Sequence, residues 1–269
     1  PAGARQQGES DCAVREQRAA WRERGAEVAI GSLDDRAFLS TTLAGAAGFF
    51  ALMPPDATAQ DFYGAQRQTA DAIAGGVADS PVPYVVMLSS IGAELAEGTG
   101  PIKGLHYMEG VLRGTGVKLI AVRAGFFQEN IADLVKAARL AGIYPNFMPS
   151  PDFAVPMIAT KDIGHLASKL LLSPPAASDV VDLVGPAYTG REISEKLSAA
   201  LGKPLHIVDI PAAGHVEALK QAGVPPAAAE ALAELYAALG TDLLQPHGDR
   251  TVAGATPIDE LIGRLVAAA

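Results

Sequence analysis

Short apolar runs alternate along this chain with stretches whose apolar residues recur every three or four positions. Strands buried on both faces of a parallel sheet read as short apolar runs, whereas a period near 3.6 residues is typical of amphipathic helices. The pattern predicts strands at Ala26–Ile30, Ala47–Met53, Tyr84–Leu88, Val117–Val122, Val180–Val184 and Leu205–Ile210. It predicts helices at Arg36–Leu43, Gln60–Ile73, Ile102–Leu112, Ile131–Ala141 and Asp162–Leu172. This alternation predicts an α/β fold with a doubly wound, mostly parallel sheet.

The chain changes character in its second half. Prolines become frequent after Pro145, and the stretch Ala212–Leu244 is alanine-rich with a helical pattern. We therefore expect a larger α/β core at residues 1–186 and a smaller, mainly helical C-terminal cap at residues 187–269.

Several predicted helix ends carry their own signals. Asp34 and Asp35 stand where a helix N-cap is expected, and Gly45 stands where that helix should stop. Thr189 and Glu192 have the spacing of a capping box. These residues predict where helices begin and end from interactions between positions that are close in sequence.

Composition limits the classes of partner. The 269 residues are 49% hydrophobic and 19% charged, enough to form a sizeable core. The formal net charge of −9 disfavours nucleic acid as a partner. No apolar stretch approaches membrane-spanning length, and the polar N-terminus does not resemble a signal peptide. A single cysteine, Cys12, excludes an internal disulfide and suits a cytoplasmic location.

Seven segments resemble, in the same order, the NmrA-like family of atypical short-chain dehydrogenases, which includes quinone-reductase-like proteins. They are Arg24–Val28, Gly31–Asp35, Phe49–Pro55, Leu88–Ala93, Thr99–Ile102 with His106 and Glu109, Arg123–Asn130, and Pro156–Gly164. The resemblance spans roughly residues 17 to 262 and implies a Rossmann-like core that binds NADP or NAD.

The resemblance also implies which residues form the site. Its segments fall at the carboxyl ends of parallel strands, where open α/β sheets bind ligands. The implied cofactor-binding residues are Arg15, Ser32, Leu33, Met53, Pro54, Ser89, Ser90, Gly125 and Phe126. The implied substrate residues are Phe127 and Asn130. The structural alternative is that Ser89 and Ser90 satisfy backbone groups of a turn and that Phe126 and Phe127 are core residues.

The glycine-rich turn that cradles a dinucleotide pyrophosphate does not occur in this sequence. In the family that segment opens the chain, but here residues 1–8 follow no apolar strand, and Gly3 and Gly8 have the wrong spacing. The resemblance implies that residues 4–7 end the first helix and that residues 10–15 form a short second strand. Arg15 would then face the 2′-phosphate of NADP; the alternative is a solvated surface charge.

Three explanations for the missing turn remain open. The full protein contains residues before Pro1, or the second strand pairs directly with the fourth, or a partner chain supplies the central strand. The absence of the first strand is costly, because this strand is central in the family's order 3-2-1-4-5 and its removal leaves two rows of backbone groups unpaired in mid-sheet.

The sequence lacks the catalytic motif of the usual short-chain dehydrogenase mechanism. That mechanism uses Tyr-x-x-x-Lys, but the residue four positions after Tyr107 is Val111. His106 and Tyr107 are candidates only for donating a hydrogen bond to the acceptor oxygen. The five histidines lack metal-ligand spacing, and no G-x-S-x-G motif occurs, so we expect neither a metal site nor a hydrolase.

Three functions follow from these observations. The first is an NAD(P)H-dependent oxidoreductase that transfers hydride directly to a quinone-like or other small acceptor. The second is an NADP-sensing regulatory protein that acts through a protein partner. The third is a Rossmann-like protein that has lost dinucleotide binding. The helix predicted at Ala227–Leu239 is expected to be packing surface, with homodimer formation as one alternative.

Overall fold

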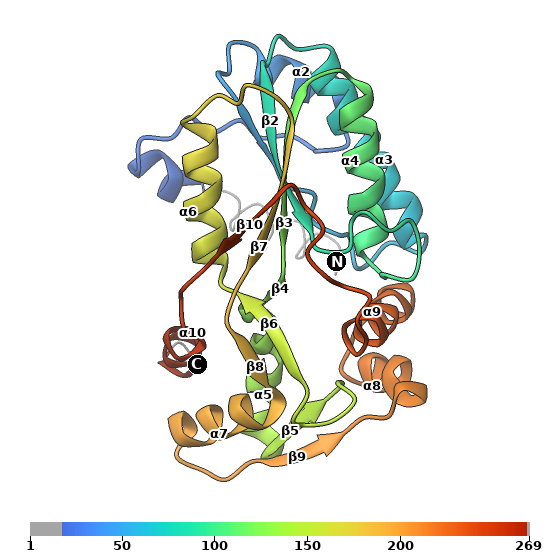
Figure 1. The fold of residues 1–269 in the computed structure, drawn as a ribbon, viewed down its shortest axis with the longest axis vertical. Coiled ribbons are helices and arrows are strands. Elements are labelled where there is room, and N and C mark those ends of the chain that lie inside the picture. The colour runs from blue at the N-terminus through green and yellow to red at the C-terminus, as the bar shows by residue number, and fades with distance from the viewer. Residues whose placement is uncertain (1–17, 268–269) are drawn as a thin grey trace, which may run out of the picture.

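The computed structural model describes residues 18–267, and its centre is a five-stranded parallel sheet (Figure 1). The strand order is β1-β2-β3-β7-β10. The bounds are β1 (Phe49–Ala51), β2 (Tyr84–Ser90), β3 (Lys118–Ala124), β7 (Asp179–Val184) and β10 (Arg250–Ala253). Every neighbouring pair in this sheet is parallel, with Val86 opposite Ile120 and Val122 opposite Val181. The predicted Rossmann-like, doubly wound fold class is confirmed.

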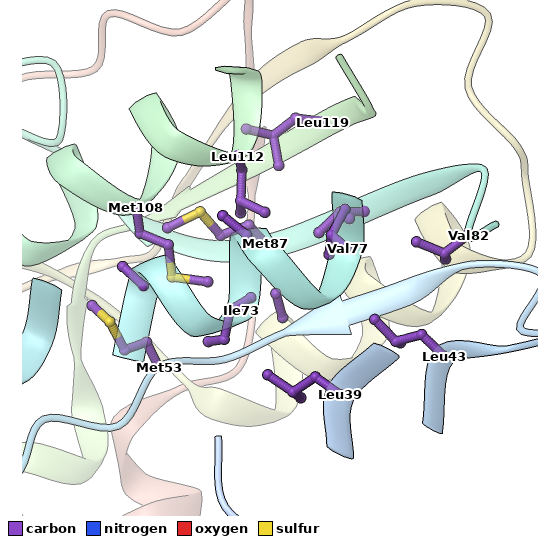
Figure 2. Close-up of a cluster of buried hydrophobic side chains, with 14 residues drawn as sticks. Leu39, Leu43, Met53, Ile73, Val77, Val82, Met87, Met108, Leu112 and Leu119 are labelled. Carbon is purple, nitrogen blue, oxygen red and sulfur yellow. The ribbon is translucent and has the colours of Figure 1, made fainter. Parts of the chain in front are cut away.

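Helices cover both faces of this sheet (Figure 1). The helices α2 (Arg36–Leu43), α3 (Phe62–Ala78) and α4 (Ile102–Gly114) cover one face, and α6 (Thr160–Leu171) covers the other. Alternation along β2 explains the two layers, because Val85 and Met87 join the α3–α4 core whereas Val86 packs with Ile163 of α6. Figure 2 shows the α3–α4 core, a cluster of buried side chains that includes Ile73 of α3, Met87 of β2 and Met108 of α4.

A second group of elements lies beyond the carboxyl ends of the central strands (Figure 1). It contains the small sheet β4 (Phe126–Phe127), β6 (Ala154–Ile158) and β8 (Ala187–Thr189), and the pair β5 (Ile143–Asn146) and β9 (His206–Asp209). Its helices are α5 (Ala132–Ala141), α7 (Gly190–Leu201), α8 (His215–Gln221), α9 (Pro226–Leu239) and α10 (Ile258–Ala267), with short 3-10 turns at Gln128–Ile131 and Ala212–Gly214. Between α9 and α10 the chain returns to the main sheet as β10. The division at residue 187 stays a prediction.

The capping residues predicted at the ends of helices are present in the structure. An oxygen of Asp35 accepts a hydrogen bond from the Phe38 amide at 3.0 Å and caps α2. Gly45 follows this helix with a φ of 81°, in the left-handed region that glycine adopts without strain. Thr189 and Glu192 form the predicted capping box of α7.

The strand predicted at Ala26–Ile30 is wrong. Residues 18–23 are helical, but residues 26–30 have no regular secondary structure and pair with no strand among those described. An apolar run becomes a strand only when a neighbour accepts its hydrogen bonds, and Ile30 is 57% exposed instead of buried. The strand predicted at residues 10–15 lies outside the described residues.

Candidate active site

A cleft of about 680 Å³ opens at the carboxyl ends of β1, β2 and β3. Met53 and Pro54 follow β1, Ser89 and Ser90 end β2, and Gly125 follows β3. Because parallel strands end at the same edge of a sheet, side chains that are far apart in sequence meet here. The strand tips thus converge on one crevice instead of pointing to different sides of the molecule.

The facing wall comes from α9 and from the loop that joins it to β10. This wall presents apolar side chains, namely Leu232, Leu235, Leu239, Leu244 and Pro246. Sequence reasoning treated the α9 segment as packing surface and did not place it at the site. The contact is between segments more than a hundred residues apart in sequence, so no local pattern could reveal it.

The structure brings together most, but not all, of the implied site residues. Those that line the cleft are Met53, Pro54, Ser89, Ser90, Gly125, Phe126, Phe127 and Asn130. Ser32 and Leu33 do not: the Ser32 hydroxyl accepts from the Asp34 amide at 3.1 Å, and Leu33 packs against the α3–α4 core. Arg15 lies outside the described residues.

His106 and Tyr107 also do not line the cleft. Ile102 and Leu105 of α4 do, and at about 100° per residue Tyr107 points away from Leu105. The Tyr107 hydroxyl donates to Asp71 at 2.9 Å, and this bond raises the pKa of Tyr107. The His106 Nδ1 lies 2.8 Å from the Ala93 carbonyl oxygen. Helical rotation therefore turns Tyr107 toward α3, and His106 contacts the loop after β2.

A buried ion pair lies beneath the cleft floor. The Ser89 hydroxyl donates to Glu109 Oε1 at 2.6 Å, and Arg123 binds both oxygens of the same carboxylate. Burial by itself would raise the pKa of Glu109, but hydrogen bonds from Arg123, Ser89 and Arg113 outweigh burial and lower it. Glu109 is therefore ionised and cannot donate. The Ser89 hydroxyl already donates its hydrogen bond to Glu109, so toward the cleft Ser89 can act only as a hydrogen-bond acceptor.

Gln66 of α3 is a polar cleft residue that sequence reasoning missed. It is 5% exposed, and its Nε2 donates to the Pro101 carbonyl at 3.1 Å. Its Oε1 has no hydrogen-bond partner among the described residues. A Cβ on Gly104 would overlap the Gln66 amide, so the glycine makes room for it. The sequence signal for this inward position is its helical spacing, since Gln66 lies four residues after Phe62 and four before Ala70, on the buried face of α3.

Charge is scarce in the cleft. Among its described lining residues, Asp242 is charged and there is no lysine, arginine or histidine. Residues 18–267 contain no cluster of three or more His, Cys, Asp or Glu side chains able to hold a metal ion. In the same range no helix has the length and apolar character needed to cross a membrane. An apolar crevice with a few polar atoms fits an uncharged nicotinamide ring, whereas these residues offer no cation to the phosphates.

The parallel sheet with a ligand-sized cleft at its carboxyl edge defines a Rossmann-like α/β protein. The NmrA-like family matches residues 11–262, and the chain belongs to that family. The resemblance inferred from the seven ordered segments is confirmed.

Two relatives extend this comparison. The NAD(P)H azoreductase of Xenophilus azovorans is 29% identical over 224 residues, covering 82% of this chain and 74% of the relative. A (4-alkanoyl-5-oxo-2,5-dihydrofuran-3-yl)methyl phosphate reductase of Streptomyces griseus is 30% identical over 221 residues, covering 81% of this chain and 74% of the relative.

Solved structures share the fold. The triphenylmethane reductase of Citrobacter sp. complexed with NADP(H) has a TM-score of 0.76 at 19% identity, covering 93% of this chain and 87% of that one. The NADPH-dependent quinone oxidoreductase of Escherichia coli complexed with NADPH has a TM-score of 0.73 at 19% identity, covering 92% and 86%. At this identity the likeness shows the fold alone.

Proposed function

We propose that this chain is an NAD(P)H-dependent oxidoreductase that transfers hydride directly to a flat, uncharged, conjugated acceptor such as a quinone. The observation that carries the proposal is the apolar cleft of about 680 Å³ at the carboxyl ends of β1–β3. A space of this size suits two flat rings lying face to face.

The described residues divide the cleft into two sides. Met53, Pro54, Ser89, Ser90 and Gly125 would hold the nicotinamide ring, since they stand at the strand ends. The lone pairs of Ser89 would accept the N–H of the carboxamide. A bound nicotinamide dinucleotide would supply the hydride, and one solvent proton would complete reduction of a quinone to its hydroquinone.

The acceptor would lie on the other side of the cleft. Phe127, Asn130 and the leucines of α9 face the strand ends and would cover the acceptor, excluding water from the transferred hydride. Because α9 and its following loop form this wall, we propose that residues 187–269 serve mainly the acceptor side.

Two further observations support this reaction. None of the described cleft residues is a lysine or histidine, so a mechanism without an internal general acid suits the site better than alcohol dehydrogenation. Relatives and structural neighbours are named for azo, triphenylmethane and quinone reduction, which supports an aromatic acceptor. Neighbours complexed with NADP(H) support NADP as the cofactor.

Purified protein mixed with NADPH and 1,4-naphthoquinone tests the proposal. We expect nicotinamide absorbance to fall with enzyme-dependent kinetics and calorimetry to detect NADPH binding. Leu235→Trp should fill the cleft and raise KM for the quinone at unchanged thermal stability, whereas Leu140→Trp, at a side chain 79% exposed on α5, should change nothing.

Two outcomes would overturn it. NADPH binding without turnover on quinones, azo dyes or triphenylmethane dyes would replace it with the NADP-sensing alternative. Neither binding nor turnover would favour a Rossmann-like protein that has lost its dinucleotide.

A further inference from the structure

A smaller cavity of about 70 Å³ adjoins the cleft. The two spaces have five lining residues in common, namely Phe126, Asn130, Phe153, Val155 and Leu239. We call this smaller cavity the side pocket. It lies on the acceptor side, next to Asn130 and Leu239.

Two tyrosines line the side pocket from different elements. Tyr144 comes from β5 and is 5% exposed, and Tyr236 comes from α9 and is half-buried. Across residues 18–267, neither hydroxyl has a hydrogen-bond partner, unlike that of Tyr188, which accepts from the Ile258 amide at 3.0 Å. Neither hydroxyl oxygen is among the fully buried unpaired atoms, so both are open to the pocket, and each can donate to a polar group that enters it.

The ring of Tyr236 is held in place by aromatic neighbours. Phe147 stacks on it with ring centres 4.8 Å apart and an interplanar angle of 17°. His215 meets Phe147 edge-on at 5.2 Å and Tyr236 at 6.0 Å, and its Nε2 lies 3.0 Å from the Ile210 carbonyl oxygen. The hydroxyl is thus presented from a fixed ring, which lowers the entropy lost when it binds a ligand group.

Both hydroxyls are donors in this setting. Burial raises the pKa of Tyr144, with the Tyr236 oxygen adding to the effect. Burial also raises the pKa of Tyr236, with Asp133 adding to the effect. The tyrosines therefore stay protonated, and the negative charge of Asp133 disfavours an anionic ligand group.

The volume limits the size of the group that fits. An engineered apolar cavity that binds benzene measures about 150 Å³, whereas a cavity of about 10–15 Å³ holds one water. At about 70 Å³ the side pocket is too small for a ring but large enough for a substituent of a few heavy atoms.

We propose that the side pocket is a substituent site for the acceptor. It binds an uncharged hydrogen-bond-accepting group, such as a carbonyl, carried at the far end of an aromatic acceptor, with Tyr144 and Tyr236 as donors. The proposal rests on the proposed function and narrows its substrate class to elongated aromatic acceptors with a distal oxygen.

A pair of dyes of matched shape tests the proposal. 4-Acetylazobenzene carries the distal carbonyl, and 4-isopropylazobenzene replaces the carbonyl oxygen by a methyl group. Visible absorbance titrations with the protein and oxidised NADP measure dye affinity without turnover. We expect wild-type protein to bind the acetyl dye about tenfold more tightly, the equivalent of one or two net hydrogen bonds.

Variants of the two tyrosines test whether the side pocket causes this preference. Tyr236→Phe and Tyr144→Phe should each reduce the preference, and the double variant should abolish it with the affinity for the isopropyl dye unchanged. Tyr107→Phe is the control, because its hydroxyl binds Asp71 outside both cavities. Thermal unfolding shows whether each variant is folded. If the double variant does not fold, a folded single variant still tests the proposal, because each is expected to reduce the preference.

The possible failures are distinguishable. Equal affinity of the wild type for both dyes, or a preference that survives the double variant, would overturn the side-pocket proposal while 1,4-naphthoquinone reduction still supports the function. Loss of dye binding together with absence of naphthoquinone turnover would overturn both.

Discussion

Arg123 at the end of β3 holds Glu109 of α4 in a two-point ion pair. Its Nε lies 3.0 Å from Glu109 Oε1 and its Nη2 lies 2.9 Å from Oε2. Arg123 also donates to Glu94 at 2.8 Å, and Ser89 donates to Glu109 at 2.6 Å. The pair therefore ties together β2, β3, α4 and the loop after β2 directly beneath the cleft floor.

Glu109→Gln should destabilise the protein strongly. It leaves the buried Arg123 guanidinium with the partly exposed Glu94 as its remaining ion-pair partner, and removing one partner of a buried pair costs about 3–5 kcal/mol. Urea unfolding at pH 7 measures the change in the free energy of unfolding. Glu260→Gln is the matched control, because the Lys161–Glu260 pair is about half exposed and should contribute less than about 1 kcal/mol.

The same variant should lose its effect in acid. The folded-state pKa of Glu109 is lowered, so its stabilisation is present above the unfolded-state pKa, near ~4.3, and is lost as the pH falls through the folded value. Unfolding curves of wild type and Glu109→Gln should therefore converge below about pH 4. A constant gap between pH 7 and pH 3 would contradict the assignment.

Asp182→Asn should stabilise the protein at neutral pH. Asp182 of β7 is 1% exposed, its Oδ2 accepts from the Gly248 amide, and its Oδ1 has no partner among the described residues. Burial raises its pKa, so its favourable contribution is present below the unfolded value and is lost as the pH rises through the raised folded value. Asparagine keeps the Gly248 bond and stays neutral.

Thermal unfolding from pH 3 to pH 8 checks this sign. The melting temperature of Asp182→Asn should exceed that of the wild type at pH 7–8, and the difference should shrink toward pH 3. A lower melting temperature at pH 7 would show that the carboxylate is needed beside Arg123.

Gly100 and Gly116 form a matched pair for testing how α9 is held. Both have positive φ, 59° and 79°, so alanine is strained at either position. A Cβ on Gly100 would overlap the carbonyl oxygen of Ala231 in α9, whereas a Cβ on Gly116 meets nothing within 4 Å. Gly100→Ala should therefore be the more destabilising by at least about 1 kcal/mol, in the range of overpacking.

Ligand binding gives the second measurement for this pair. Because α9 forms the cleft wall, Gly100→Ala should also weaken acceptor binding, and Gly116→Ala should not. Equal losses of stability and unchanged binding in both variants would mean that α9 shifts freely on the loop before α4.

The parts of the fold predicted best are those specified within a few residues. The helix Arg36–Leu43 was predicted with its observed bounds because Asp35 caps it and Gly45 follows it. The strand ends that line the cleft were also predicted, because parallel topology brings Ser89 and Gly125 to one edge once the strands are recognised.

What sequence reasoning missed depends on contacts between distant segments. Ala26–Ile30 has strand composition but no described partner, and Gln66 becomes a cleft residue only through Pro101, 35 residues away. Glu234 fastens α9 to the core, because its carboxylate accepts a hydrogen bond from Lys103 of α4 at 2.8 Å and one from Tyr63 of α3 at 3.2 Å. No periodicity encodes these pairings, so the wall could not be predicted. The orientation of Tyr107, by contrast, follows from the helical period once Leu105 is known to line the cleft.

The charge of the cleft predicts a preference among acceptors. Asp242 is the charged side chain of the described cleft lining, so a sulfonated naphthoquinone should be repelled relative to 1,4-naphthoquinone. Asp242→Asn should lower KM for the sulfonated quinone about two- to threefold at low salt, with no change for the neutral quinone.

Salt and a remote carboxylate provide the controls for the effect of Asp242. An exposed charge acts through solvent, so about 0.5 M salt should remove most of the difference between wild type and Asp242→Asn. Asp259→Asn on α10 removes the same charge at a residue that pairs with Lys196 and lines neither cavity, and it should leave both KM values unchanged. If Asp259→Asn matched Asp242→Asn, net charge would explain the preference; if neither variant altered KM, Asp242 would not face the bound acceptor.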